Sequence, residues 1–357
     1  MQWISQSDFS LLRLRRQHLQ LLLLHPHAPE SKDVENHLWM QTSYAFIAAY
    51  KQRINALDRL LYNRPQQPQG QPQQQQQRNT GAGPVEYRKL LQRFRQFLAE
   101  EEKFWAKLVG RLYRTFVLED ARSVLQLLGI PLEEEAGVPG QGHGRNQQQF
   151  PPEDPTPRLE AKNTSEKEAY MSTLSKTLVF LGDVARYREL YNEAGGRPRA
   201  GHEEGSPARK RNRRAPTWME NISKARNYDK AQQYYEQARL LVPNEGKPSH
   251  QLAILASYKN DAYMSLAHYY RALCVKQSYD TALNNMNTLL SKTLDTWRAS
   301  TRHDKSRNLP LDVELHPAVR VEKFKERLAV LHALWRIGSE SGVDKCVVLY
   351  LIIPAPD

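Results

Sequence analysis

Acidic and histidine side chains are the first candidates for chemistry in this sequence. Glu100–Glu102 and Glu133–Glu135 place carboxylates next to one another, as general acid–base catalysis requires. Both clusters lie in polar stretches that we expect to be exposed, where paired carboxylates are usually only solvated. The closest histidines, His25 and His27, have no Cys or carboxylate at the spacing of metal ligands. We therefore expect no catalytic residue, no metal site and no cofactor.

The motifs of nucleotide-binding and nucleophilic enzymes are missing as well. The chain contains no GxxxxGK[ST], no GxGxxG and no GxSxG. Residues 137–144 are rich in glycine, but no strand pattern precedes them, so we do not expect a phosphate loop there. An enzyme is therefore the class of protein that the sequence supports least.

A short basic run is the densest charge feature. Five of the seven residues 208–214 are basic, namely Arg209, Lys210, Arg211, Arg213 and Arg214. Such a run is typical of a nuclear-import sequence or a nucleic-acid contact, but a solvated loop that only aids solubility has the same composition. The formal net charge of +12 and the pI of about 9.5 favour acidic partners such as nucleic acid or phosphorylated peptides.

Two tyrosine pairs allow two interpretations. Tyr234–Tyr235 and Tyr269–Tyr270 have the ring faces on which single-stranded nucleic acid stacks. Their helical spacing beside Ala and Leu favours packing between helices instead, with the hydroxyl reaching water or a polar partner.

The composition places the chain in a reducing compartment. Cys274 and Cys346 are the only cysteines among 357 residues and form no disulfide framework. The apolar runs 21–24 and 346–353 are shorter than the roughly 20 residues that span a bilayer. Basic residues interrupt the sequence that precedes the run 21–24, which is typical of an amphipathic helix and not of a signal peptide. We expect no targeting or membrane segment, and a location in the nucleus and cytoplasm.

Three low-complexity segments interrupt an otherwise helical pattern. Residues 63–84, 133–158 and 195–217 are rich in Gln, Gly, Pro or Arg and have too few apolar residues to offset their ordering entropy. We expect them to be disordered insertions or linkers.

Between the insertions, apolar residues recur every three or four positions. The spacing predicts helices over 34–62 and 86–128, the second ending at Gly129-Ile130-Pro131. Short helices follow from 228 onward, with Asp261 as the N-cap of one of them, and a last helix spans 321–335. Small Ala beside large Tyr and Leu is typical of stacked antiparallel helix pairs, so the predicted fold class is all-α and tetratricopeptide-like.

Four sequence blocks occur in an order that resembles a known family. They are LGDVARYR at 181–188, YDKAQQYYEQA at 228–238, LVPNEG at 241–246 and QLAILA at 251–256. With Leu38-Trp39 and YYRAL at 269–273, they are similar to the Ever-Shorter-Telomeres-like family of telomerase-associated and nonsense-mediated mRNA decay adaptors. The low-complexity insertions suggest a fungal-type member.

The resemblance implies a 14-3-3-like and tetratricopeptide-like domain over 1–296. Residues 297–357 resemble the start of a C-terminal helical hairpin domain that is apparently truncated. The resemblance also implies a concave helical surface, with an RNA helicase or other decay factors, telomerase components, or telomeric DNA or RNA as partners. We expect a non-catalytic adaptor, with direct nucleic-acid binding through basic patches as the alternative; neither membrane nor small-molecule substrate is expected.

Phosphoserine recognition is part of what the resemblance implies. Relatives use the arginine of the LGDxAR motif, here Arg186, and a basic residue five positions after the tryptophan of the earlier helix, here Tyr44. Lys51 and Arg53 substitute for Tyr44 only if the alignment shifts. Arg186 also has a plainer interpretation, an ion pair with Asp183 or Glu189 on its own helix.

Overall fold

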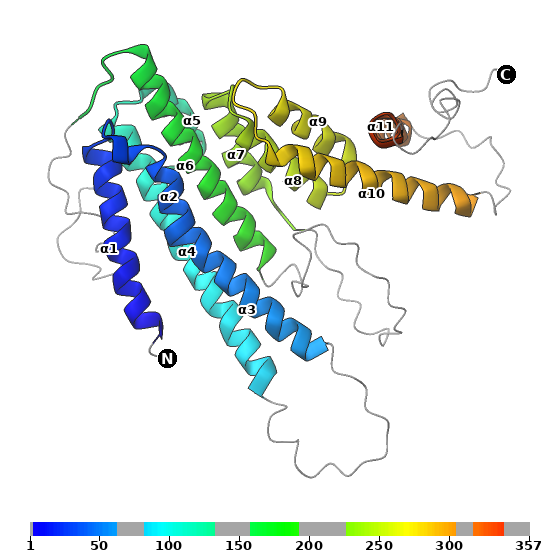
Figure 1. The fold of residues 1–357 in the computed structure, drawn as a ribbon, viewed down its shortest axis with the longest axis horizontal. Coiled ribbons are helices and arrows are strands. Elements are labelled where there is room, and N and C mark those ends of the chain that lie inside the picture. The colour runs from blue at the N-terminus through cyan, green and yellow to red at the C-terminus, as the bar shows by residue number, and fades with distance from the viewer. Residues whose placement is uncertain (1–2, 63–81, 133–157, 193–225, 305–316, 339–357) are drawn as a thin grey trace, which may run out of the picture. The chain divides into compact units, whose positions relative to one another are not determined.

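A computed structural model describes residues 3–62, 82–132, 158–192, 226–304 and 317–338, which are helices and short connections (Figure 1). Apart from an isolated bridge between Glu245 and Gln277, these residues contain no β-structure, which confirms the all-α prediction. No helix in these ranges is long and apolar enough to cross a membrane. The basic run 209–214, the apolar run 346–353 and most of the three low-complexity segments lie outside them.

The chain divides into two compact units, residues 1–237 and 238–357. The first contains α1 (Trp3–Leu24), η1 (Pro29–Ser31), α2 (Val34–Leu38), η2 (Trp39–Tyr44), α3 (Ala45–Tyr62), α4 (Ala82–Thr115), η4 (Glu119–Ala121), α5 (Arg122–Leu127), α6 (Thr164–Leu190) and most of α7 (Asp229–Leu241). The second contains α8 (Gly246–Tyr258), α9 (Ala262–Leu273), α10 (Thr281–Asp304), α11 (Pro317–Ala333) and η7 (Leu334–Gly338). The boundary expected at 296/297 falls inside α10.

The prediction of one helix over 86–128 is wrong. Helix α4 starts at Ala82, inside the segment assigned to the first insertion, and ends at Thr115. The chain then turns through Val117, whose φ is +52°, because this turn buries Phe116 and Leu118. Packing of these two side chains outweighs continuation of the helix. Gly129 adopts a φ of +66° after α5, the left-handed conformation that glycine tolerates best at a helix end.

Unit 1 has a buried polar contact among its aromatic side chains. The Arg15 guanidinium donates to the Glu101 carboxylate at 2.6 Å, although the two residues are 86 positions apart. Ser43 donates to the same carboxylate at 2.6 Å and accepts from the Trp105 indole at 3.0 Å. The contact therefore joins α1, η2 and α4.

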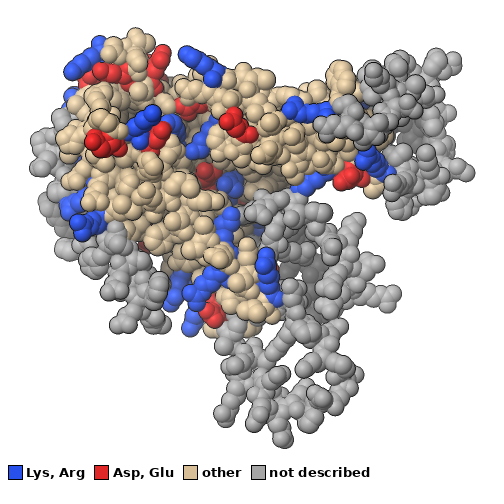
Figure 2. Space-filling model, in the orientation of Figure 1, with Lys and Arg blue, Asp and Glu red and all other residues tan. Residues whose placement is uncertain are grey.

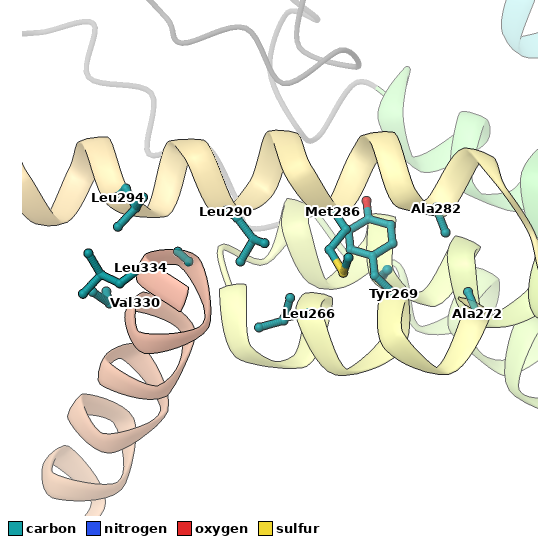
Figure 3. Packing of buried hydrophobic residues seen from close by; sticks show 11 residues of the cluster. Leu266, Tyr269, Ala272, Ala282, Met286, Leu290, Leu294, Val330 and Leu334 are labelled. Carbon is teal, nitrogen blue, oxygen red and sulfur yellow. The ribbon is translucent and has the colours of Figure 1, made fainter. Parts of the chain in front are cut away.

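Unit 2 packs around an apolar cluster shared by α8, α9, α10 and α11. Figure 3 shows Leu266 and Tyr269 of α9 facing Met286 and Leu290 of α10. Helix α11 joins this cluster only at its C-terminal end, through residues such as Val330. The Asp261 carboxylate accepts from the amide of Met264 at 2.9 Å, which confirms the predicted N-cap.

Leu255 tests the packing of α8. Its side chain is 2% exposed, so Leu255→Ala should lower the free energy of unfolding by about 2–5 kcal/mol through lost burial and the cavity left behind. Leu240, 60% exposed, is the matched control, and Leu240→Ala should cost less than about 0.5 kcal/mol. Chemical denaturation measures both, and equal small costs would place Leu255 outside the core.

Candidate functional site

The LGDVARYR motif lies in the buried C-terminal half of α6. Leu181 and Val184 are fully buried, and Gly182 makes room for the ring of Tyr235 from α7. A Cβ atom at position 182 would lie 2.5 Å from Cε1 of Tyr235. Position 182 has an ordinary helical backbone conformation, so backbone geometry does not require glycine there. The Tyr235 ring requires it, because the ring leaves no space for a Cβ atom.

Tyr235, Asp183 and Arg186 form a buried hydrogen-bonded group. The Tyr235 hydroxyl donates to Asp183 Oδ1 at 2.7 Å and accepts from Arg186 Nε at 3.4 Å. Arg186 also pairs with Asp183 at 3.4 Å, so the expected pairing within α6 is present. Burial, together with the Asp183 charge, raises the pKa of the Tyr235 phenol well above its ordinary value, so the hydroxyl stays protonated and acts as a donor.

Two cations from different helices meet at the ring of Tyr187. The Arg186 guanidinium carbon lies 4.4 Å from the ring centroid, and Nζ of Lys51, on α3, lies 5.4 Å from it. Both distances are within the range of cation–π interaction. Arg186 is 7% exposed and Lys51 is half-buried, so two positive charges meet at a ring that is itself 5% exposed.

Tyr44, the expected position of the second cation, has a different environment. It is the last residue of η2, and its ring centroid lies 6.3 Å from that of Trp39. Because η2 is a π-helix, its wider turn gives the residues that follow it angular positions different from those in a continuous α-helix. Trp39 stacks on Phe180 and Lys51 reaches Tyr187, so this stretch runs along α6 in the same direction, with Tyr44 between the two contacts.

Other candidate residues are engaged elsewhere. Arg53 pairs with Glu86 at 2.9 Å on the surface of α3 and α4. Tyr234, Tyr235 and Tyr269 are at most 5% exposed, so they offer no ring face on which a nucleic-acid base could stack. Of the two interpretations of these tyrosines, packing between helices is therefore confirmed for these three. Tyr270 is half-buried against His332.

The expectation that Glu100–Glu102 is exposed is wrong for two of its three residues. Glu101 and Glu102 are 2% and 8% exposed. Glu101 pairs with Arg15, and Glu102 pairs with Arg188 and with Lys230, the latter at 2.6 Å. Burial and the nearby Arg188 charge lower the pKa of Lys230. These carboxylates hold helices together, and no group of three or more potential metal ligands gathers within the described ranges.

Two family models match the chain in sequence order. Residues 33–192 match the model described as telomerase activating protein Est1, and residues 231–352 match the Est1 DNA/RNA binding domain. The chain belongs to the Est1/SMG7-like family. The interlock of Gly182 with Tyr235 therefore joins one residue from each matched region.

Curated relatives and a solved structure agree with this assignment. The nonsense-mediated mRNA decay factor SMG7 of Arabidopsis thaliana is 25% identical over 293 residues, 80% of this chain and 21% of the relative. SMG7 of Danio rerio is 34% identical over 113 residues, 31% of this chain and 10% of that protein. The chain thus spans about a fifth or less of these relatives. A crystal structure of Est1 and Cdc13 has the same fold, with a TM-score of 0.56 at 12% identity, covering 98% of this chain and 54% of that one.

The names of the matched models and relatives refer to telomerase and to mRNA decay. The model over 33–192 is named for telomerase activation, the model over 231–352 for DNA or RNA binding, and the curated relatives for nonsense-mediated mRNA decay. The helical architecture is of the 14-3-3-like and tetratricopeptide-like kind.

The contact between Gly182 and Tyr235 can be tested by a double-mutant cycle. Gly182→Ala should lower the free energy of unfolding by about 1–3 kcal/mol, because the added methyl group overlaps the Tyr235 ring. Tyr235→Leu should also destabilise, but the double variant should cost less than the sum, since leucine makes room for the methyl group. Strictly additive costs in chemical denaturation would contradict direct contact.

Proposed function

We propose that the chain is a non-catalytic adaptor of a ribonucleoprotein pathway that binds a phosphoserine peptide at Lys51 and Arg186. The observation that supports this most is the meeting of these two cations, from α3 and α6, at the Tyr187 ring. The site lies within the region that matches the Est1 model.

The charges at this site fit one phosphate group. A phosphoserine carries about −1.5 to −2 charges near neutral pH and offers three acceptor oxygens. The planar guanidinium of Arg186 suits two parallel hydrogen bonds to such a group, and its contacts with Tyr235 and Asp183 fix its orientation. Because Asp183 offsets part of the Arg186 charge, Lys51 is needed to make the site positive.

A second function, nucleic-acid binding, is supported by the match of residues 231–352 to the Est1 DNA/RNA binding domain. Partners of this chain would then be telomerase components, telomeric DNA or RNA, or an RNA helicase and other decay factors. Such partners are consistent with a location in the nucleus and cytoplasm, for which the basic run at 209–214 is the candidate import sequence. Affinity purification from native extract, followed by identification of a decay helicase or a telomerase subunit, separates the two pathways.

Phosphopeptide titration tests the adaptor proposal. We expect the wild type to bind a phosphoserine peptide of the helicase-type partner and to bind its unphosphorylated form at least tenfold more weakly. Lys51→Gln and Arg186→Gln should each weaken phosphopeptide binding by about tenfold or more, the equivalent of one charge-assisted bond. Arg53→Gln, which removes an exposed cation two residues from Lys51, is the matched control and should change little.

Tyr44→Lys distinguishes the two positions for the second cation. No gain from this change, combined with a loss from Lys51→Gln, would place the cation at Lys51. A gain of about tenfold in phosphopeptide affinity, equivalent to 1.4 kcal/mol of binding free energy, with no loss from Lys51→Gln, would place the phosphate beside Tyr44. Equal affinity for both peptide forms would contradict a phosphate site altogether.

A further inference from the structure

Helices α3 and α4 carry a concentration of positive charge at their far ends. Residues 53–62 and 82–93 contain five Lys and Arg against two acidic residues, a net charge of +3. We call this part of the helix pair the basic arm. Figure 2 shows blue side chains gathered over the lower ends of these helices, with little red among them.

Most of this charge has no acidic partner in the part of the chain that the structure describes. Of the two acids, Asp58 is buried and Glu86 is paired with Arg53. Four exposed cations remain that the structure gives no carboxylate among its described residues: Arg59, Arg88, Lys89 and Arg93. Solubility alone does not require such an excess on one part of a chain, whereas a polyanionic partner does.

The arm is rigid enough to hold these cations at fixed separations. Tyr50 of α3 stacks on Phe94 of α4 with ring centroids 4.9 Å apart, and Ile54 is 1% exposed in the same seam. Lys89 and Arg93 are one helical turn apart, about 6 Å between side-chain origins. The Arg53–Glu86 pair sets the register of the two helices, so the six residue steps from Arg53 to Arg59 on α3 and the seven from Glu86 to Arg93 on α4 together span about 20 Å at a rise of about 1.5 Å per residue.

We propose that the basic arm is an interaction surface for the phosphodiester backbone of a nucleic acid, separate from the segment 231–352. One strand carries a charge about every 3.4 Å, so the 20 Å arm faces about six phosphates. Several exposed cations distributed along a helix pair match a continuous line of charge better than they match one phosphorylated or acidic side chain. Tyr50, Tyr87 and Phe94 turn their rings into the seam, so the arm reads backbone charge and not base identity.

Salt dependence provides the test. In the full chain, Lys89→Gln/Arg93→Gln should reduce the slope of log affinity against log salt by about 1.4 for a 20-nucleotide oligouridylate and by about 1.8 for a 20-base-pair DNA duplex. The two probes show whether single strands or duplexes are bound. The midpoint of chemical denaturation should be unchanged, since both side chains are exposed.

The matched control removes the same charge from the same helix. Lys103 and Lys107 are also exposed on α4 and four residues apart, but lie beyond the arm. Lys103→Gln/Lys107→Gln should change the slope by less than half as much. An unchanged slope in the arm variant, or an equal change in both variants, would overturn the proposal.

Two further measurements separate this proposal from other partners. Polyglutamate of equal charge should compete for the wild type at least tenfold more weakly than the oligonucleotide; equal competition would indicate an acidic-protein surface and overturn the assignment to nucleic acid. Phosphopeptide binding should be unchanged in the arm variant, because Lys51 and Arg186 are intact. Loss of phosphopeptide binding would show that Lys89 and Arg93 also act on the peptide site, and would overturn the proposal of a separate surface.

Discussion

The close approach of Tyr235 to Gly182 is the constraint on which the proposed peptide site depends. Any side chain larger than hydrogen at position 182 would overlap the tyrosine ring, whose nearest carbon lies 2.5 Å from the site of a Cβ. Only because the ring lies against the α6 backbone does its hydroxyl reach both Asp183 and Arg186. The glycine, the aspartate and the arginine of the motif thus serve one arrangement, the first by its size and the others by their hydrogen bonds.

Buried charge sets a second constraint on unit 1. Arg15 is 1% exposed and Glu101 is 2% exposed, so each ion has lost nearly all its hydration and depends on the other. Removing one partner of such a pair typically costs about 3–5 kcal/mol, because the remaining charge stays buried and uncompensated. Glu102 is also buried, but its partners Arg188 and Lys230 remain 45% and 62% exposed, so these pairs join α4 to α6 and α7 with a smaller contribution to stability. These ion pairs favour a single register of the helices over alternatives that an apolar core alone would tolerate.

Local patterns in the sequence were enough for the fold class and several details. Helical periodicity predicted the α-helices, and Asp261 was predicted as the N-cap of the helix observed as α9. The spacing of Tyr234 and Tyr235 beside alanine predicted that both side chains are buried. The features that were missed depend on distant residues. Nothing near Glu101 in the sequence indicates that Arg15 neutralises it, so its burial was not predictable.

The site residues were only partly predictable for a related reason. Arg186 follows from its motif, but the contact of Lys51 with the Tyr187 ring depends on the angular position of the residues after Trp39. The π-helix at 39–44 changes that position without any distinctive residue in its sequence. The family motif points to Tyr44, which stays a prediction, and nothing in the sequence indicates that Lys51 lies at the Tyr187 ring.

Helix α3 contributes cations to two surfaces, and an aromatic seam separates them. Lys51 lies beside Tyr187 of α6, while Arg59 lies two turns further along, on the basic arm. Between these positions the chain packs against α4, and α4 in turn meets the end of α6, where Phe94 contacts Tyr191 and Arg95 donates to the Tyr191 carbonyl at 2.6 Å. Arg95 is half-buried and held by that carbonyl, so its side chain lies in the seam and not among the exposed cations of the arm. On the two proposals made above, a phosphopeptide and a nucleic-acid strand would occupy separate places on unit 1, as an adaptor that holds both at once requires.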